Sequence, residues 1–68
     1  MSGAEVRQVM ENHGFQLVRQ RGSHMILQRR LAETTITVPV PDHRELRRGT
    51  LSSIIRQSQL PHELFEAI

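Results

Sequence analysis

Hydrophobic residues near the start of the chain have the spacing of a helix. Three of them recur at intervals of three and four residues, as on one helical face: Val6, Val9 and Met10. The preceding segment, Ser2-Gly3-Ala4-Glu5, matches a capping box, in which the serine caps the helix and the glutamate reaches back to it. Gly14 suits a left-handed turn. We therefore expect a helix that ends near Asn12.

Between positions 15 and 30 the pattern shifts towards a period of two, interrupted at Gly22-Ser23. Because Gly-Ser suits a type II′ turn, this segment predicts a β-hairpin in which Arg21 and His24 face each other. A longer turn would shift the register by one residue and move Arg21 to the other face. The alternation leaves open which face is covered. In the two-residue-turn register one face carries Val18, Met25 and Leu27, and the other carries Phe15, Leu17 and Ile26.

The rest of the chain predicts one more strand and a second helix. After a turn at 31–33, the β-branched run 35–38 alternates strictly, and Pro39 and Pro41 should stop that strand or confine it to an edge. Four residues then follow at helical spacing: Leu51, Ile54, Ile55 and Ser58. Thr50 is a candidate N-cap for this helix. Pro61 suits the first turn of a short last helix, which would carry Leu64, Phe65 and Ile68.

This order of elements predicts a single α+β domain over residues 1–68, without repeats or linkers. No stretch is long and apolar enough to span a membrane, so we expect no membrane partner. The N-terminus lacks the pattern of a secretory signal, which predicts a cytoplasmic protein. Since cysteine is absent, disulfides and thiolate chemistry are excluded.

All nine basic residues are arginine, although the formal net charge is only +2. Guanidinium groups bind phosphate through a planar fork and stack on bases, which favours a nucleic-acid partner. Solvated arginines in an arginine-biased genome would give the same composition. Charge alone therefore leaves both readings open.

The histidines and acids do not form a recognised metal site. His13, His24, His43 and His62 lie 11, 19 and 19 residues apart, and Asp42 is the only aspartate. We therefore expect no metal and no other cofactor. Ser23 and His24 are adjacent at a strand start, where neighbouring side chains point to opposite faces, so they do not predict a nucleophile and its base.

Two segments remain as candidates for chemistry on phosphate groups. His24 carries an imidazole, which exchanges protons near neutrality, as transesterification by an RNA 2′-hydroxyl requires, and Arg21 across the hairpin would hold the phosphate. An ordinary strand-end histidine is the alternative. In Arg47-Arg48-Gly49-Thr50, cationic side chains precede a helix N-terminus, which attracts anions. The alternative there is a pair of solvated arginines and a helix cap.

Four segments occur together in an order typical of one family: Asn12-His13-Gly14-Phe15, Arg21-Gly22-Ser23-His24, Thr37-Val38-Pro39-Val40, and Gly49-Thr50-Leu51 with Ile54 and Ile55. On these motifs the chain resembles HicA-type mRNA interferase toxins, from Gly3 to Phe65. The resemblance implies a fold like a double-stranded RNA-binding domain, α-β-β-β-α, with a three-stranded antiparallel sheet and helices on one face. It also implies an endoribonuclease that cleaves mRNA, and a HicB-type antitoxin as partner.

The position that matches the family's active histidine is His24. RNA is then expected against seven residues of the hairpin and second helix: Arg19, Arg21, Gly22, Ser23, Arg47, Arg48 and Thr50. The chain departs from the family pattern twice. Arg21 stands where many members have lysine, and Gln59 stands where a glycine often ends the second helix, so the turn after that helix is in doubt.

Two other functions fit the same residues. One is a non-catalytic module that binds double-stranded RNA by shape and phosphate contacts. The other is a protein-binding component that docks a partner on an exposed sheet face and has no affinity for RNA.

Overall fold

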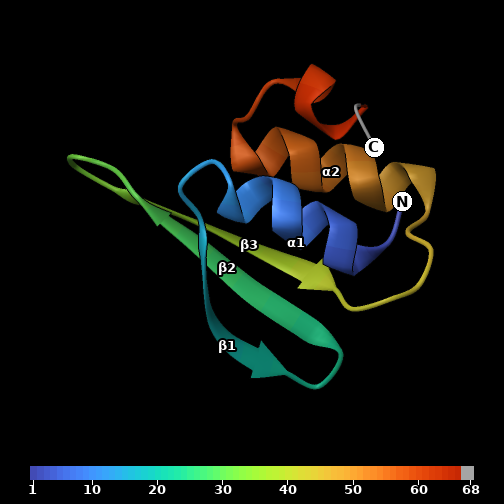
Figure 1. Ribbon diagram of the computed structural model, residues 1–68. Helices are drawn as coiled ribbons and strands as arrows, with labels where there is room; N and C mark the ends of the chain where they lie inside the picture. The colour runs from blue at the N-terminus through green and yellow to red at the C-terminus, as the bar shows by residue number, and fades with distance from the viewer. Residues whose placement is uncertain (67–68) are drawn as a thin grey trace.

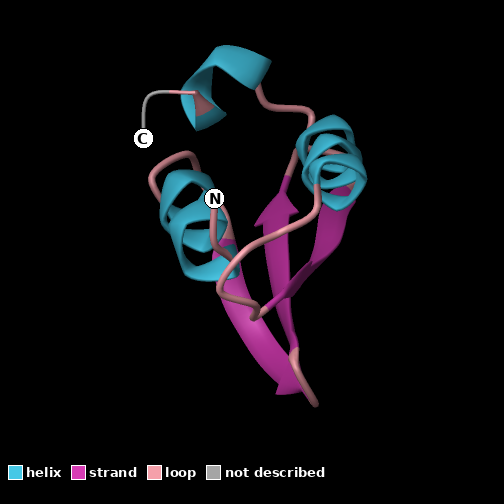
Figure 2. Ribbon diagram, turned by 90° about the vertical axis from the view of Figure 1, so that its right-hand side faces the viewer, coloured by secondary structure: helices cyan, strands magenta, loops and turns pink. Residues whose placement is uncertain are grey.

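A computed structural model describes residues 1–66 and shows two α-helices, three strands and a short 3₁₀ helix (Figure 1). In chain order these are α1 (Gly3–Glu11), β1 (Gln16–Arg21), β2 (His24–Arg30), β3 (Thr35–Pro41), α2 (Arg48–Ser58) and the 3₁₀ helix η1 (His62–Phe65). The sheet is antiparallel, in the order β1-β2-β3. Figure 2 shows α1 and α2 on the same side of this sheet. The predicted α-β-β-β-α order is confirmed.

The capping box at the start of α1 is present. The Glu5 backbone N–H donates to Ser2 Oγ at 3.0 Å, and the Ser2 N–H donates to Glu5 Oε1 at 2.8 Å. Gly14 follows the helix with φ 97°, in the left-handed region that glycine adopts without strain. A Cβ on Gly3 would overlap the carbonyl oxygen of Pro41, so glycine at this position lets α1 lie against the end of β3.

The hairpin has the predicted two-residue turn, since Arg21 pairs with His24. Gly22 has a positive φ of 57° and Ser23 does not, which is the pattern of a type II′ turn. A β-bulge further along β1 changes the predicted faces. Leu17 pairs with Leu27 and Arg19 with Ile26, so Val18 is left unpaired and is 46% exposed.

Because of this bulge, Leu17 joins Phe15, Met25 and Leu27 on the helix-covered face. The assignment of Val18 to the face of Met25 and Leu27 was therefore wrong, as was the assignment of Phe15 and Leu17 to the face of Ile26. We call the opposite side of the sheet the outer face. It carries Arg19 and Arg21 of β1, His24 and Ile26 of β2, and the β3 residues that pair with β2 here, Pro39 and Pro41.

β3 continues through both prolines, which corrects the expectation that they stop it. Pro39 pairs with Ile26 and Pro41 with His24. β3 is an edge strand, as the alternative prediction held. Residues two apart direct their backbone N–H groups to the same side of a strand, so both prolines leave the free edge without a donor and the pairing with β2 intact.

α2 begins earlier than predicted. Its N-cap is Arg47, whose side chain makes no capping hydrogen bond, and Thr50 is the third residue of the helix. The prediction of Thr50 as N-cap was therefore wrong. Gln59 ends the helix at φ 61°, so this chain builds the left-handed cap without glycine. Pro61 lies just before η1 instead of in its first turn, and Ile68 lies outside the described residues.

The core lies between the helices and the sheet. Its buried residues come from α1, β2, β3, α2 and η1 and from the two loops that join helices to strands, and Leu17 of β1 packs against them partly buried. The buried residues are Val6, Val9, Met10, Phe15, Met25, Leu27, Ile36, Val38, Val40, Leu46, Ile54, Ile55 and Phe65. α2 packs chiefly against β3. This packing leaves the outer face uncovered by helices, and His24 lies on that face.

Candidate active site at the hairpin end of the sheet

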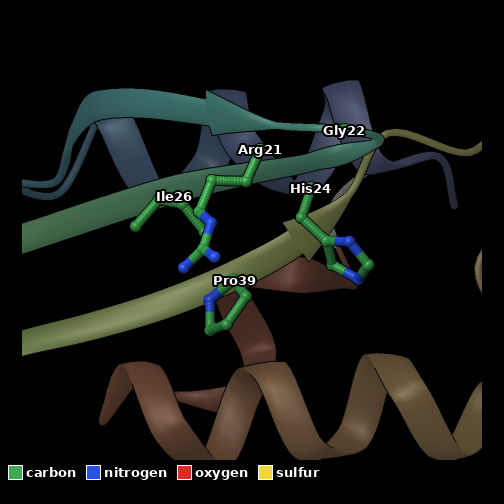
Figure 3. A pocket seen from close by; sticks show the side chains of 5 residues that line it. All are labelled: Arg21, Gly22, His24, Ile26 and Pro39. Carbon is green, nitrogen blue, oxygen red and sulfur yellow. The ribbon is translucent and has the colours of Figure 1, made fainter.

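Arg21 and His24 lie opposite each other at the end of the β1–β2 hairpin, and both project from the outer face (Figure 3). With Gly22, Ile26 and Pro39 they line a cavity of about 520 Å³. The Arg21 side chain extends past Ile26 towards Pro39. Ile26 is only 8% exposed, although it faces away from the helices. The cavity therefore combines a cation and an imidazole with an apolar wall.

A second cavity, of about 380 Å³, lies on the other side of His24, between the sheet and α2. The sheet contributes His24, Pro39 and Pro41, and α2 contributes Gly49, Thr50, Ser53, Ile54 and Gln57. We call this cavity the α2 groove. His24 and Pro39 line both cavities, so the imidazole lies where the two meet.

Backbone hydrogen bonds hold the hairpin turn in place beside β3. The Asp42 N–H donates to the Ser23 carbonyl oxygen at 2.6 Å, and the Gly3 N–H donates to the His43 carbonyl oxygen at 2.9 Å. These bonds connect the turn, the end of β3 and the start of α1. The exposed His24 side chain has no hydrogen-bond partner among residues 1–66, so both ring nitrogens are available to a bound molecule.

The other residues predicted to contact RNA surround this site unequally. Thr50 lines the α2 groove and also a neighbouring cavity, which Arg47 lines as well. Arg47 therefore lies next to the α2 groove but does not line it. Arg19 lies two residues from Arg21 on the outer face and is exposed. Arg48 is exposed in the first turn of α2. Ser23 serves the turn through its backbone, and within the described chain no hydrogen bond joins its hydroxyl to His24.

The remaining histidines have other surroundings. His13 Nδ1 contacts the Val9 carbonyl oxygen at 3.0 Å, and His62 Nδ1 contacts Glu66 Oε2 at 2.6 Å. Over residues 1–66, no three side chains of the metal-ligating types gather at one place. Of the four histidines, His24 is the one that borders both the cavity beside Arg21 and the α2 groove.

Six further lining residues were not predicted from the sequence as part of a site: Ile26, Pro39, Pro41, Ile54, Ser53 and Gln57. A signal for the last two was present, because positions 49, 53 and 57 recur at intervals of four and must share one side of a helix. The periodicity does not show where α2 lies in the fold. In the structure α2 packs against β3, and the side of α2 that carries these positions borders the groove beside His24.

Comparison with known families gives an independent result. Residues 3–60 match the family described as the HicA toxin of bacterial toxin-antitoxin systems. The chain belongs to the HicA toxin family. A search of curated proteins gave no match. As the toxin of a toxin-antitoxin system, a HicA protein has an antitoxin as its partner. Within residues 1–66, no helix has the length and apolar character needed to cross a membrane.

Proposed function

We propose that this HicA protein is an endoribonuclease that cleaves mRNA in the cytoplasm, with His24 as its catalytic residue. The observation that carries the proposal is the position of His24, which is exposed between two cavities and directly opposite Arg21. An imidazole transfers protons near neutral pH, and an adjacent guanidinium offsets the charge of a phosphodiester. Both groups project from the same face of the hairpin.

The reaction is a transesterification within the RNA. The 2′-oxygen attacks the adjacent phosphorus, the bond from phosphorus to the 5′-oxygen breaks, and the products carry a 2′,3′-cyclic phosphate and a 5′-hydroxyl. The 2′-hydroxyl loses one proton and the leaving 5′-oxygen gains one. His24 acts at one of these two oxygens, with water completing the exchange at the other, while Arg21 stabilises the negative charge on the phosphate. No step requires a metal ion.

RNA lies along the outer face in this proposal. Arg19 continues the positive charge of Arg21 along β1, and Arg47 and Arg48 extend it at the start of α2. Gly22 and Ser23 form the turn against which the backbone passes, and Thr50 borders the groove. We also propose that the antitoxin is of the HicB type and that it covers His24 when it binds.

The test compares wild type with His24→Ala, both as growth arrest after induction and as cleavage of labelled RNA by the purified proteins in EDTA. Since general acid-base catalysis contributes about 10²- to 10⁴-fold, we expect the alanine variant to lose at least about 10²-fold in cleavage rate and to stop arresting growth. End-group analysis of the wild-type products should find the cyclic phosphate.

His62→Ala is the matched control, because His62 is an exposed histidine on η1, outside both cavities. It should cleave RNA at the wild-type rate. An alanine variant at position 24 that remains toxic with an unchanged cleavage pattern contradicts the assignment. A wild-type protein that binds RNA without cutting it would instead be a non-catalytic RNA-binding module.

A further inference from the structure

The α2 groove differs in chemistry from the cavity around Arg21. None of the residues that line it is an arginine, an aspartate or a glutamate, and its polar side chains are those of the shared His24, Thr50, Ser53 and Gln57. Ser53 and Gln57 stand one helical turn apart on the side of α2 that borders the groove. Arg21 thus lies in the cavity on one side of His24, and hydroxyl and amide groups line the groove on the other side.

The polar side chains in the groove have unused hydrogen-bonding capacity. Neither Ser53 nor Gln57 has a side-chain hydrogen bond to any of residues 1–66. Two glutamines of the sheet have one: Gln20 Nε2 donates to the Gly22 carbonyl oxygen at 3.1 Å, and Gln28 Nε2 donates to Thr37 Oγ1 at 3.2 Å. A hydroxyl and a primary amide both donate and accept, so together they can match the edge of a nucleobase.

The groove also has room for a ligand against the helix. A Cβ placed on Gly49 would have no neighbour within 4 Å, so glycine is not needed there for packing within the protein. The volume of about 380 Å³ falls within the range of ligand pockets, about 300–1,000 Å³. Pro39 and Pro41 supply an apolar wall on the sheet side, against which a planar base can pack.

From this arrangement we propose that the α2 groove binds the nucleotide next to the cleaved phosphodiester, and that Ser53 and Gln57 select its base. The inference rests on the proposed function and adds the element of substrate selection. The phosphate lies with Arg21 and His24, while the uncharged base enters the uncharged groove. Since a base edge is accessible in this way only when the base is unpaired, the substrate at this position is single-stranded RNA.

The experiment measures cleavage of a single-stranded RNA library, randomised around the cut, by wild type, Ser53→Ala and Gln57→Ala. Wild type should prefer one base at a position flanking the cleaved bond. Loss of a hydrogen bond to that base should reduce the preference about tenfold in either variant, because an unpaired group no longer penalises the wrong base. Cleavage of the least favoured RNAs should change far less.

Ser52→Ala and Gln8→Ala are the matched controls. Ser52 is exposed on α2 outside the groove, and Gln8 is exposed on α1. Both should keep the wild-type preference. Gln57→Glu gives a second variant that retains the length of the side chain. Because a carboxylate only accepts hydrogen bonds, this variant should shift the preference towards bases that present an amino group.

The inference is overturned if wild type shows no base preference beside the cut, or if Ser53→Ala, Gln57→Ala and Gln57→Glu all keep the wild-type preference. In either case the loss of cleavage in His24→Ala would leave the proposed function standing. Absence of cleavage by wild type itself would overturn both. Circular dichroism melting of each variant identifies any that fails to fold, and the remaining variants at positions 53 and 57 then decide the result.

Discussion

At the scale of single residues, Gln59 is the one non-glycine residue among those described that has a positive φ. Its φ of 61° is left-handed, where an L side chain costs roughly 1–2 kcal/mol. We expect Gln59→Gly to raise the free energy of unfolding by about 1 kcal/mol, since glycine relieves this strain but loses some entropy on folding. Urea denaturation of the two proteins measures the difference. RNA cleavage should not change.

Gln57→Gly provides the opposite control for stability, because Gln57 lies within α2 with a negative φ. Glycine there should lower the free energy of unfolding by somewhat less than about 1 kcal/mol. Equal effects of the two substitutions, in either direction, would contradict the role assigned to the left-handed cap.

The residues of the candidate site show how much of a site can be predicted from a sequence. The pairing of Arg21 with His24 followed from the chemistry of Gly22 in a tight turn, which is local. The positions of Ser53 and Gln57 beside His24 depend on contacts between α2 and β3, which are distant in the chain. Local patterns determine the hairpin, and the groove arises only when the elements pack.

At the scale of elements, the start of α1 gives a prediction for pH. The hydrogen bond from the Ser2 backbone N–H is the main cause that lowers the pKa of Glu5. A carboxyl group whose pKa is lower in the folded state stabilises the fold above its unfolded pKa and loses this effect as the pH falls through the folded value. Glu5→Gln should therefore reduce stability at pH 7, with a difference from wild type that shrinks in acid.

Thermal or urea unfolding of wild type and Glu5→Gln, at neutral pH and well below the ordinary pKa of glutamate, measures this effect. Ser2→Ala removes the cap itself and should cost about 1 kcal/mol at neutral pH. It should retain part of that cost in acid, because the hydroxyl accepts the Glu5 N–H bond at any pH. A Glu5→Gln difference that does not depend on pH would contradict the charged form of the capping box.

Predictions for the elements failed where the pairing of strands decided the outcome. The bulge at Val18 adds one residue to β1, and no alternation within β1 alone indicates such an insertion. The two prolines were compatible with a strand end or with an edge, and the pairing of β3 with β2 selected the edge. Helix starts depend on backbone geometry as well as side chains, which is why Arg47 and not Thr50 precedes α2.

At the scale of the whole molecule, the two sides of the sheet carry different groups. The helices cover one side, and the outer face presents Arg19, Arg21 and His24 around the two cavities. Arg7 lies on α1, on the other side of the sheet, and its Nε pairs with Glu11 Oε2 at 3.1 Å. If RNA binds along the outer face and the start of α2, the arginines there should contribute to the dependence of affinity on salt, and Arg7 should not.

Each phosphate contact with single-stranded nucleic acid adds about 0.7 to the slope of log affinity against log salt concentration. We expect Arg21→Gln to reduce this slope by about 0.7 to 1, while Arg7→Gln leaves it unchanged. Binding is measured with 2′-O-methylated RNA, which lacks the attacking hydroxyl and so remains uncut during titration. A slope that falls for Arg7→Gln and not for Arg21→Gln would place RNA on the helical side and separate its binding surface from His24.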